Sequence, residues 1–182
     1  MSLHPATVAE TGALPMGQGA CAEQAPESGA ALLANEPVSA LGWSLRLGSW
    51  DELRDSASAV RQAVFVREQG IPQSLEWDEA DSNCLHAVIL DEGNRPVATG
   101  RLLPDGHIGR MAVLAECRRT GLGGQVLQAL IEAARQRGHL CVALSAQVHA
   151  LSFYRRHGFV AEGPIYDDVG IPHQDMTKPL EP

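Results

Sequence analysis

The chain has 182 residues, the length of one domain with a tail. Its 22 acidic and 14 basic residues give a net charge of −8, which argues against a nucleic-acid binder, because such proteins normally present a basic face. There is no apolar run of about 18 residues and no signal-peptide pattern, so we expect no membrane association and a cytoplasmic protein.

The first 40 residues differ in composition from the rest of the chain. Residues 1–40 are rich in Ala, Gly, Pro, Glu and Ser and contain no Lys or Arg. Such a segment buries little apolar surface and contains several residues that break regular structure. We therefore predict a flexible extension over residues 1–40 and a folded domain over residues 41–182.

The apolar pattern after this boundary changes period several times. Alternation predicts a strand over 38–47, and three- and four-residue spacing predicts a helix over 50–69, whose apolar face extends to Glu68. An acidic loop follows at 76–81. Apolar runs at 86–90 and 96–103, joined by the turn 91–94, predict a hairpin, and a further strand is expected at 108–114.

The second half of the chain alternates helices and strands. Val126, Leu127, Leu130, Ile131 and Ala134 mark one face of a helix that Gly138 ends. We expect a strand at 140–144, a helix at 149–157, and closing strands at 159–162 and 174–177. The order is strand, helix, three strands, helix, strand, helix and two strands, which predicts an α/β fold with one mixed sheet.

A glycine-rich turn lies between a predicted strand and a predicted helix, with the sequence Arg-Arg-Thr-Gly-Leu-Gly-Gly over residues 118–124. The first amides of a helix have no internal partners, glycines allow close approach, and the two arginines add mobile positive charge. This favours a diphosphate site; the alternative is a helix start with small residues for close packing. Gln125 and Val126 break the Walker and dinucleotide-binding patterns, respectively.

Four separated segments resemble one known family. Arg118-x-x-Gly121-x-Gly123 resembles the acyl-CoA motif of the GNAT N-acetyltransferase superfamily, and 146–159, ending in Tyr-x-x-x-Gly-Phe, resembles its second CoA-side motif. Residues 64–72, the acidic loop, and Gly-Ile-Pro-His at 170–173 with Met176 resemble the ElaA/YjcF-type branch. The matches run in the family's order from about Trp43 to the C-terminus.

The resemblance implies a GNAT-like mixed central sheet flanked by helices, with a splay between the strand that ends at Val113 and the strand 140–144. It implies acetyl-CoA as cosubstrate. The pantetheine arm would pair with strand amides left open by the splay, as an added strand does. The implied cofactor-binding residues are Met111, Ala112 and Val113 on the strand, Arg118, Arg119, Thr120, Gly121, Leu122, Gly123 and Gly124 in the turn, and Gln147 and Phe153.

Tyr154 matches the family's general-acid tyrosine, which would protonate the departing sulfur. The alternative is a half-buried tyrosine that only packs. The general base stays open, because several carboxylates and histidines qualify and water could also remove the proton. The candidates on the acceptor side are Glu76, Asp78, His86 and His173, with Trp77 as a lining residue and Asp81, His107 and His149 as further bases.

Other readings of the function remain. Arg61-x-x-Val64-Phe65, the acidic loop and Arg101-Leu-Leu-Pro also resemble acyl-homoserine-lactone synthases, but those enzymes usually lack the Arg-x-x-Gly-x-Gly turn. A non-catalytic acyl-CoA-binding regulatory module is a second alternative, and the presence of Tyr154 counts against it. The acceptor would be a small-molecule or peptide amine, and a homodimer is compatible with the sequence. The four cysteines show no CxxC spacing and no cluster with histidine, so no metal is expected.

Overall fold

The structure is a computed structural model that describes residues 42–76 and 78–181. The predicted extension over residues 1–40, the beginning of the first predicted strand and Trp77 lie outside these residues. Within the described part of the chain, none of the helices has the length and apolar character needed to cross a membrane.

The described elements follow the predicted order of strands and helices. In chain order they are β1 (Ser44–Gly48), α1 (Trp50–Arg61), η1 (Gln62–Glu68), α2 (Gln73–Glu76), η2 (Glu79–Asn83), β2 (Leu85–Leu90), β3 (Pro96–Leu102), β4 (Ile108–Val113), η3 (Ala115–Cys117), α3 (Leu122–Gln136), β5 (Cys141–Gln147), η4 (Val148–Ala150), α4 (Leu151–Arg156), β6 (Val160–Asp168) and β7 (Ile171–Pro179).

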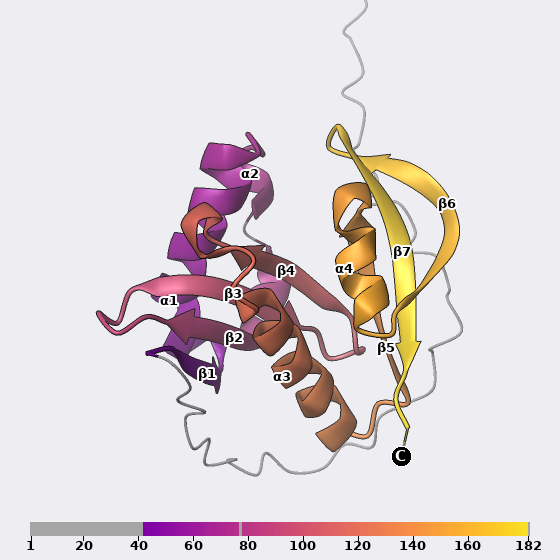
Figure 1. Ribbon diagram of the computed structural model, residues 1–182, viewed down its shortest axis with the longest axis horizontal. Helices are drawn as coiled ribbons and strands as arrows, with labels where there is room; N and C mark the ends of the chain where they lie inside the picture. Colours follow the sequence, from indigo (N-terminus) through magenta and orange to yellow (C-terminus); the bar gives the residue numbers. More distant parts are fainter. Residues whose placement is uncertain (1–41, 77, 182) are drawn as a thin grey trace, which may run out of the picture.

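The first sheet is antiparallel, with strand order β1-β2-β3-β4, and it is covered on both faces. In β2, Ala87 and Ile89 join the core that includes α3, whereas Val88 and Leu90 pack with residues of α1. Figure 1 shows α3 in front of this sheet and α1 behind it. Burial on both faces explains why β2 is a continuous apolar run rather than an alternating one.

The second sheet is also antiparallel, with order β5-β7-β6. Val142, Leu144 and Met176 are buried on one face and share the main core with Tyr154 of α4. Strands β6 and β7 have nine residues each, longer than predicted. The sequence missed the extra length because the residues added to these strands are mostly exposed and show no apolar alternation, so backbone pairing rather than an apolar pattern defines them.

The two sheets meet at a single point, where His107 and Ala143 form a parallel bridge and the Ala143 amide donates to the Gly106 carbonyl at 3.3 Å. Beyond this bridge, β4 and β5 are not paired with each other in the described residues. We call this divergence between the unpaired parts of β4 and β5 the splay. The splay confirms the GNAT-like α/β fold. The predicted mixed sheet consists of two antiparallel sheets that are joined by one parallel bridge.

A bulge in β4 accompanies the splay. Thr99 pairs with Ala112 and Arg101 pairs with Gly109, so Gly100 alone faces both Arg110 and Met111. Arg110 has a φ of +50°, which is uncommon for a residue with a side chain. A Cβ on Gly100 would lie 2.5 Å from the Met111 sulfur and 2.9 Å from Val126 Cγ1, so a side chain there would displace Met111 or α3.

The long helix predicted over 50–69 is interrupted by a wider turn. A capping box between Ser49 and Glu52 begins α1, and the chain then continues as the π-helix η1. The Gln69 amide donates to the Val64 carbonyl at 3.0 Å, five residues back. π-helical turns are rare and frequently lie at functional sites, and here the turn ends at residues 68 and 69.

Candidate active site

The N-terminus of α3 is open. Gly121 precedes the helix with a φ of +89°, and the first intrahelical hydrogen bond runs from Gln125 N to Gly121 O at 3.1 Å. No side chain caps this end. The first amides of α3 therefore have no partner within the helix, and they add to the positive end of the helix dipole. This arrangement suits an anionic group.

Gly121 and Gly123 differ in whether the fold itself requires glycine at that position. Gly121 adopts a left-handed conformation that favours glycine. Gly123 has no such constraint, and a Cβ there would meet Val113 Cγ2 at 3.5 Å and Phe153 Cζ at 3.6 Å, which are ordinary contacts. Neither backbone strain nor packing explains Gly123. The same contacts bring together three predicted cofactor-binding positions, at the end of β4, the start of α3 and on α4.

Arg118 is held in place rather than mobile. Its guanidinium donates to both carboxylate oxygens of Glu68, at 2.8 and 2.6 Å, and its Nε donates to the Val113 carbonyl at 3.1 Å. The hydrogen bond from Arg118 lowers the pKa of Glu68. Glu68 is 43% exposed, so its placement on the apolar face of the predicted helix is wrong. Arg119 is exposed and has a φ of +65°.

The ends of η1 and β5 are linked by a pair of amide side chains. Gln69 Nε2 donates to Gln147 Oε1 at 3.2 Å, and Gln147 Nε2 donates to Gln69 Oε1 at 3.0 Å. The two residues are 78 positions apart, so no local pattern could indicate that they meet. Gln147, predicted to contact the cofactor, thus lies at the end of β5 and is fastened to the π-helical turn.

Tyr154 is buried on α4 with only 8% of its surface exposed. Its ring lies edge-on to those of Phe153 and Phe159, with centroid distances of 5.0 and 5.9 Å. Burial raises the pKa of Tyr154 to about 12. The phenol is therefore protonated throughout the usual assay range, as a proton donor must be.

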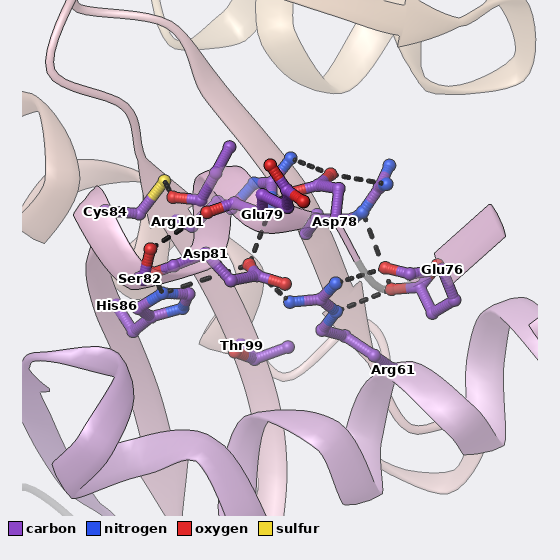
Figure 2. Close-up of polar contacts among 12 residues, drawn as sticks. Arg61, Glu76, Asp78, Glu79, Asp81, Ser82, Cys84, His86, Thr99 and Arg101 are labelled. Atoms are coloured by element: carbon purple, nitrogen blue, oxygen red, sulfur yellow. Dashed lines mark hydrogen bonds and ion pairs between the residues drawn. The ribbon is translucent and has the colours of Figure 1, made fainter. Parts of the chain in front are cut away.

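The acidic segment is not a solvated loop but two short helices, α2 and η2, that enclose buried carboxylates. Glu76 and Asp81 are each 2% exposed. Arg61, itself buried, donates through Nε to Glu76 Oε1 at 2.5 Å and through Nη1 to Asp81 Oδ1 at 2.8 Å (Figure 2). Because an unpaired buried charge is costly, these ion pairs are what allows the carboxylates to be buried.

Two further arginines extend this group toward the surface. Arg101 binds both oxygens of Asp78, at 2.7 and 2.8 Å, and also Asp81 Oδ1 at 2.7 Å. Arg110, on the β4 bulge, donates to Asp78 Oδ2 at 3.1 Å and to the Leu75 carbonyl at 3.3 Å. We call this group of three arginines and three carboxylates the arginine–carboxylate cluster: Arg61, Arg101, Arg110, Glu76, Asp78 and Asp81.

The cluster balances three positive and three negative charges. Burial alone would raise the pKa values of Asp78 and Asp81, but the hydrogen bonds and charges of the arginines outweigh it and lower both. Burial keeps the pKa of Glu76 raised despite its bond to Arg61. The cluster ties the acidic segment to α1, β3 and the bulge of β4, and so fixes one edge of the splay.

The predicted acceptor-side residues do not form one group. His86 is 1% exposed, donates from Nε2 to the Asp81 carbonyl at 2.9 Å, and has a pKa lowered by burial. Glu76, Asp78 and His86 therefore lie together, with only Asp78, at 36%, substantially exposed. His173 lies in the other half, on β7, with Nδ1 2.8 Å from the Ile171 carbonyl. The described residues contain no group of three or more side chains suited to a metal ion.

Comparison with known proteins identifies the family. The model of the GNAT acetyltransferase domain matches residues 53–180. The uncharacterised N-acetyltransferase YjcF of Bacillus subtilis is 39% identical over 132 residues, covering 70% of this chain and 93% of YjcF. The crystal structure of an acyl-CoA N-acyltransferase from Pseudomonas aeruginosa matches with a TM-score of 0.66 and 30% identity, covering 75% of this chain and 99% of that chain.

The crystal structure of Escherichia coli ElaA also matches, with a TM-score of 0.66 and 27% identity over 75% of this chain and 99% of that one. The chain belongs to the GNAT acetyltransferase family, as its motifs predicted, and its similarity to YjcF and ElaA supports the predicted branch. It is an acetyltransferase enzyme, and family membership implies an acyl-CoA cosubstrate and an amine acceptor.

Proposed function

We propose that the enzyme binds acetyl-CoA in the splay and transfers its acetyl group directly to an amine in a ternary complex. The observation that carries this proposal is the position of the uncapped N-terminus of α3 beside the end of β4, where β4 has lost its pairing with β5. An anionic group and an extended amide-bearing chain would each find a complementary surface there.

In this proposal the diphosphate binds the amides of residues 119–124. The pantetheine arm runs along Met111, Ala112 and Val113 and pairs with the edge of β4 that faces the splay. Arg118 then acts through its bonds to Glu68 and Val113, which hold the turn against the strand, rather than as a free counter-charge. Phe153 packs beside Gly123 and limits the width of the site.

The reaction needs one bond to form and one to break. A neutral amine attacks the thioester carbonyl, the C–N bond forms, and the C–S bond breaks as sulfur leaves. We propose that Tyr154 donates its proton to the departing sulfur, for which its protonated state is suited. The proton lost by the amine passes to water or to a base that we do not assign, because Glu76 is buried within the arginine–carboxylate cluster and His86 is buried beside it.

Isothermal titration calorimetry with acetyl-CoA, CoA, ATP and NAD tests the binding step, and thiol release in the presence of amines tests transfer. We expect micromolar-range binding of acetyl-CoA and CoA only, and amine-dependent thiol release. Binding of ATP or NAD together with no response to CoA would refute the proposal. Binding of CoA without thiol release across a broad amine panel would favour the regulatory-module alternative.

A further inference from the structure

One face of the second sheet carries a row of polar side chains. Along β5 and β7, Leu144 and Met176 point into the core shared with α4, so alternation turns Ser145, Gln147, His173 and Asp175 to the opposite face. Figure 1 shows α4 covering only one face of this sheet, and Ser145 and Asp175 on the other face are exposed.

Tyr166 joins this row across three strands. It lies on β6, yet its hydroxyl is hydrogen-bonded to the Ser145 hydroxyl on β5 and donates to Asp175 Oδ1 on β7 at 2.7 Å. Its ring also stacks on His173, with a centroid distance of 6.2 Å and an interplanar angle of 25°. The Asp175 carboxylate is therefore oriented by a tyrosine that is half-exposed and whose ring stacks on His173.

The row begins where the splay begins. Ser145 lies two residues beyond Ala143, the last position at which β5 is bridged to the other sheet. Gln147, two residues further, is fastened to Gln69. The row thus follows β5 along the splay, on the face of the sheet opposite to Tyr154. A group held on this row would approach the splay from the side away from the general acid.

The electrostatics of this face favour a cation. No Lys or Arg occurs between Gly158 and Thr177, and Asp168 lies on the same face as Asp175 because it pairs with Ile171. Among the described residues, neither aspartate is in a salt bridge, whereas Glu68, Glu76, Asp78 and Asp81 on the other half all pair with arginine. Asp175 is an oriented carboxylate with no cationic partner among them.

We propose that Asp175, oriented by Tyr166 and Ser145, binds the ammonium group at one end of a diamine acceptor, while the other amine, in its neutral form, attacks in the splay. The inference rests on the proposed acetyl transfer and names the acceptor class. Tyr166 is a positioning residue in this arrangement, because it acts through Asp175. The site discriminates between amines by their second charge rather than by the amine that reacts.

Steady-state transfer to putrescine and to n-butylamine, which has the same chain length but one amine, tests the inference. We expect the wild-type enzyme to have a lower KM for putrescine. Asp175→Asn should raise that KM about tenfold, the size of one charge-assisted hydrogen bond, and leave kcat and the KM for n-butylamine unchanged. Tyr166→Phe should raise the putrescine KM by a smaller factor. Asp55→Asn, which removes an exposed carboxylate from α1, controls for net charge and should change neither KM.

Calorimetric titration of putrescine into the protein saturated with CoA tests the site independently of transfer. Putrescine binding that is weakened by Asp175→Asn but not by Asp55→Asn would support the diamine site. If such binding were found but no amine were acetylated, the proposed acetyl transfer would fail while the diamine site would stand. Equal KM values for putrescine and n-butylamine in the wild type, or a putrescine preference that survives in Asp175→Asn, would overturn it. Absence of both putrescine binding and transfer would overturn it as well.

Discussion

Replacing Gly123 by alanine separates a requirement of the fold from a requirement of the ligand. The added Cβ would lie 3.5 Å from Val113 Cγ2 and 3.6 Å from Phe153 Cζ, so the protein without ligand has room for it. Alanine in place of glycine stabilises a helix interior by about 0.5–1 kcal/mol. Position 123 lies in the first turn of α3, where the gain is at the lower end. We expect Tm to stay the same or to rise by roughly 1–3 °C.

The effect on the ligand should be opposite. If the diphosphate lies on the amides of this turn, the methyl group enters the space that its oxygens occupy and lengthens at least one charge-assisted hydrogen bond. Such a bond contributes about 1.5–3 kcal/mol, so the Kd for CoA should rise by roughly ten- to a hundredfold. Gly123→Val, with a branched side chain, should weaken binding further. Calorimetry and thermal melting of the same preparations measure both effects.

Gly121→Ala is the matched control. Its φ of +89° is strained for alanine, so this variant should lose stability by roughly 1 kcal/mol in the absence of any ligand. The two glycines therefore predict opposite changes in Tm. A folded Gly123→Ala protein with the wild-type Kd for CoA would show that the diphosphate does not bind this turn. A fall in Tm without ligand would show that Gly123 serves packing.

Three other predictions concern the proposed general acid Tyr154, the N-terminal segment and the arginine–carboxylate cluster. Tyr154→Phe should lower kcat by about 10²–10⁴-fold with little change in CoA affinity or Tm, and an unchanged kcat would make Tyr154 a packing residue. Because burial raises the pKa of Tyr154 to about 12, the wild-type kcat should show no alkaline limb from this phenol below about pH 11. Deleting residues 2–38 should leave the Kd for acetyl-CoA unchanged in a calorimetric titration, and loss of binding by a folded truncated protein would contradict the predicted domain boundary. Asp81→Asn should lower the free energy of unfolding by about 3–5 kcal/mol, because it removes the carboxylate that pairs with both Arg61 and Arg101 in a buried site. Since the folded pKa of Asp81 lies below its unfolded value, this contribution is complete at neutral pH and is lost as the pH falls through the folded pKa, so acid melts of wild type and variant should converge.

Local signals in the sequence predicted the order of elements and the turn before α3. Gly121 and the apolar face of α3 lie within a few residues of one another, so spacing alone indicates a helix start with open amides. The splay was expected only through the family resemblance, because no local pattern reports the loss of pairing between β4 and β5. The extra length of β6 and β7 was missed because most of their added residues are exposed and follow no apolar alternation.

Contacts between side chains far apart in the chain could not be predicted from the sequence. Glu68 and Arg118 are 50 positions apart, and Arg61 and Asp81 are 20 apart, so their pairing depends on how the sheets assemble. An acidic run is most often exposed to water. The acidic segment here is partly buried because α1 and β3 each contribute a buried arginine that pairs with its carboxylates. Tyr166, Ser145 and Asp175 lie on three strands, and none of them stands out by local spacing.

The two faces of the splay give a reason for the division of roles proposed for the enzyme. In thioester aminolysis the amine approaches one side of the carbonyl carbon and sulfur departs from another, so an acid for sulfur and a binding site for the amine cannot occupy the same place. Tyr154 belongs to the core on the face covered by α4, while Asp175 and Tyr166 lie on the opposite face of the second sheet. The arginine–carboxylate cluster holds Arg110 at positive φ in the β4 bulge, and the Gln69–Gln147 pair fastens the end of β5. Side-chain contacts thus hold both edges of the splay without a ligand. Such preorganisation favours binding, because less of the binding free energy is spent on ordering the site.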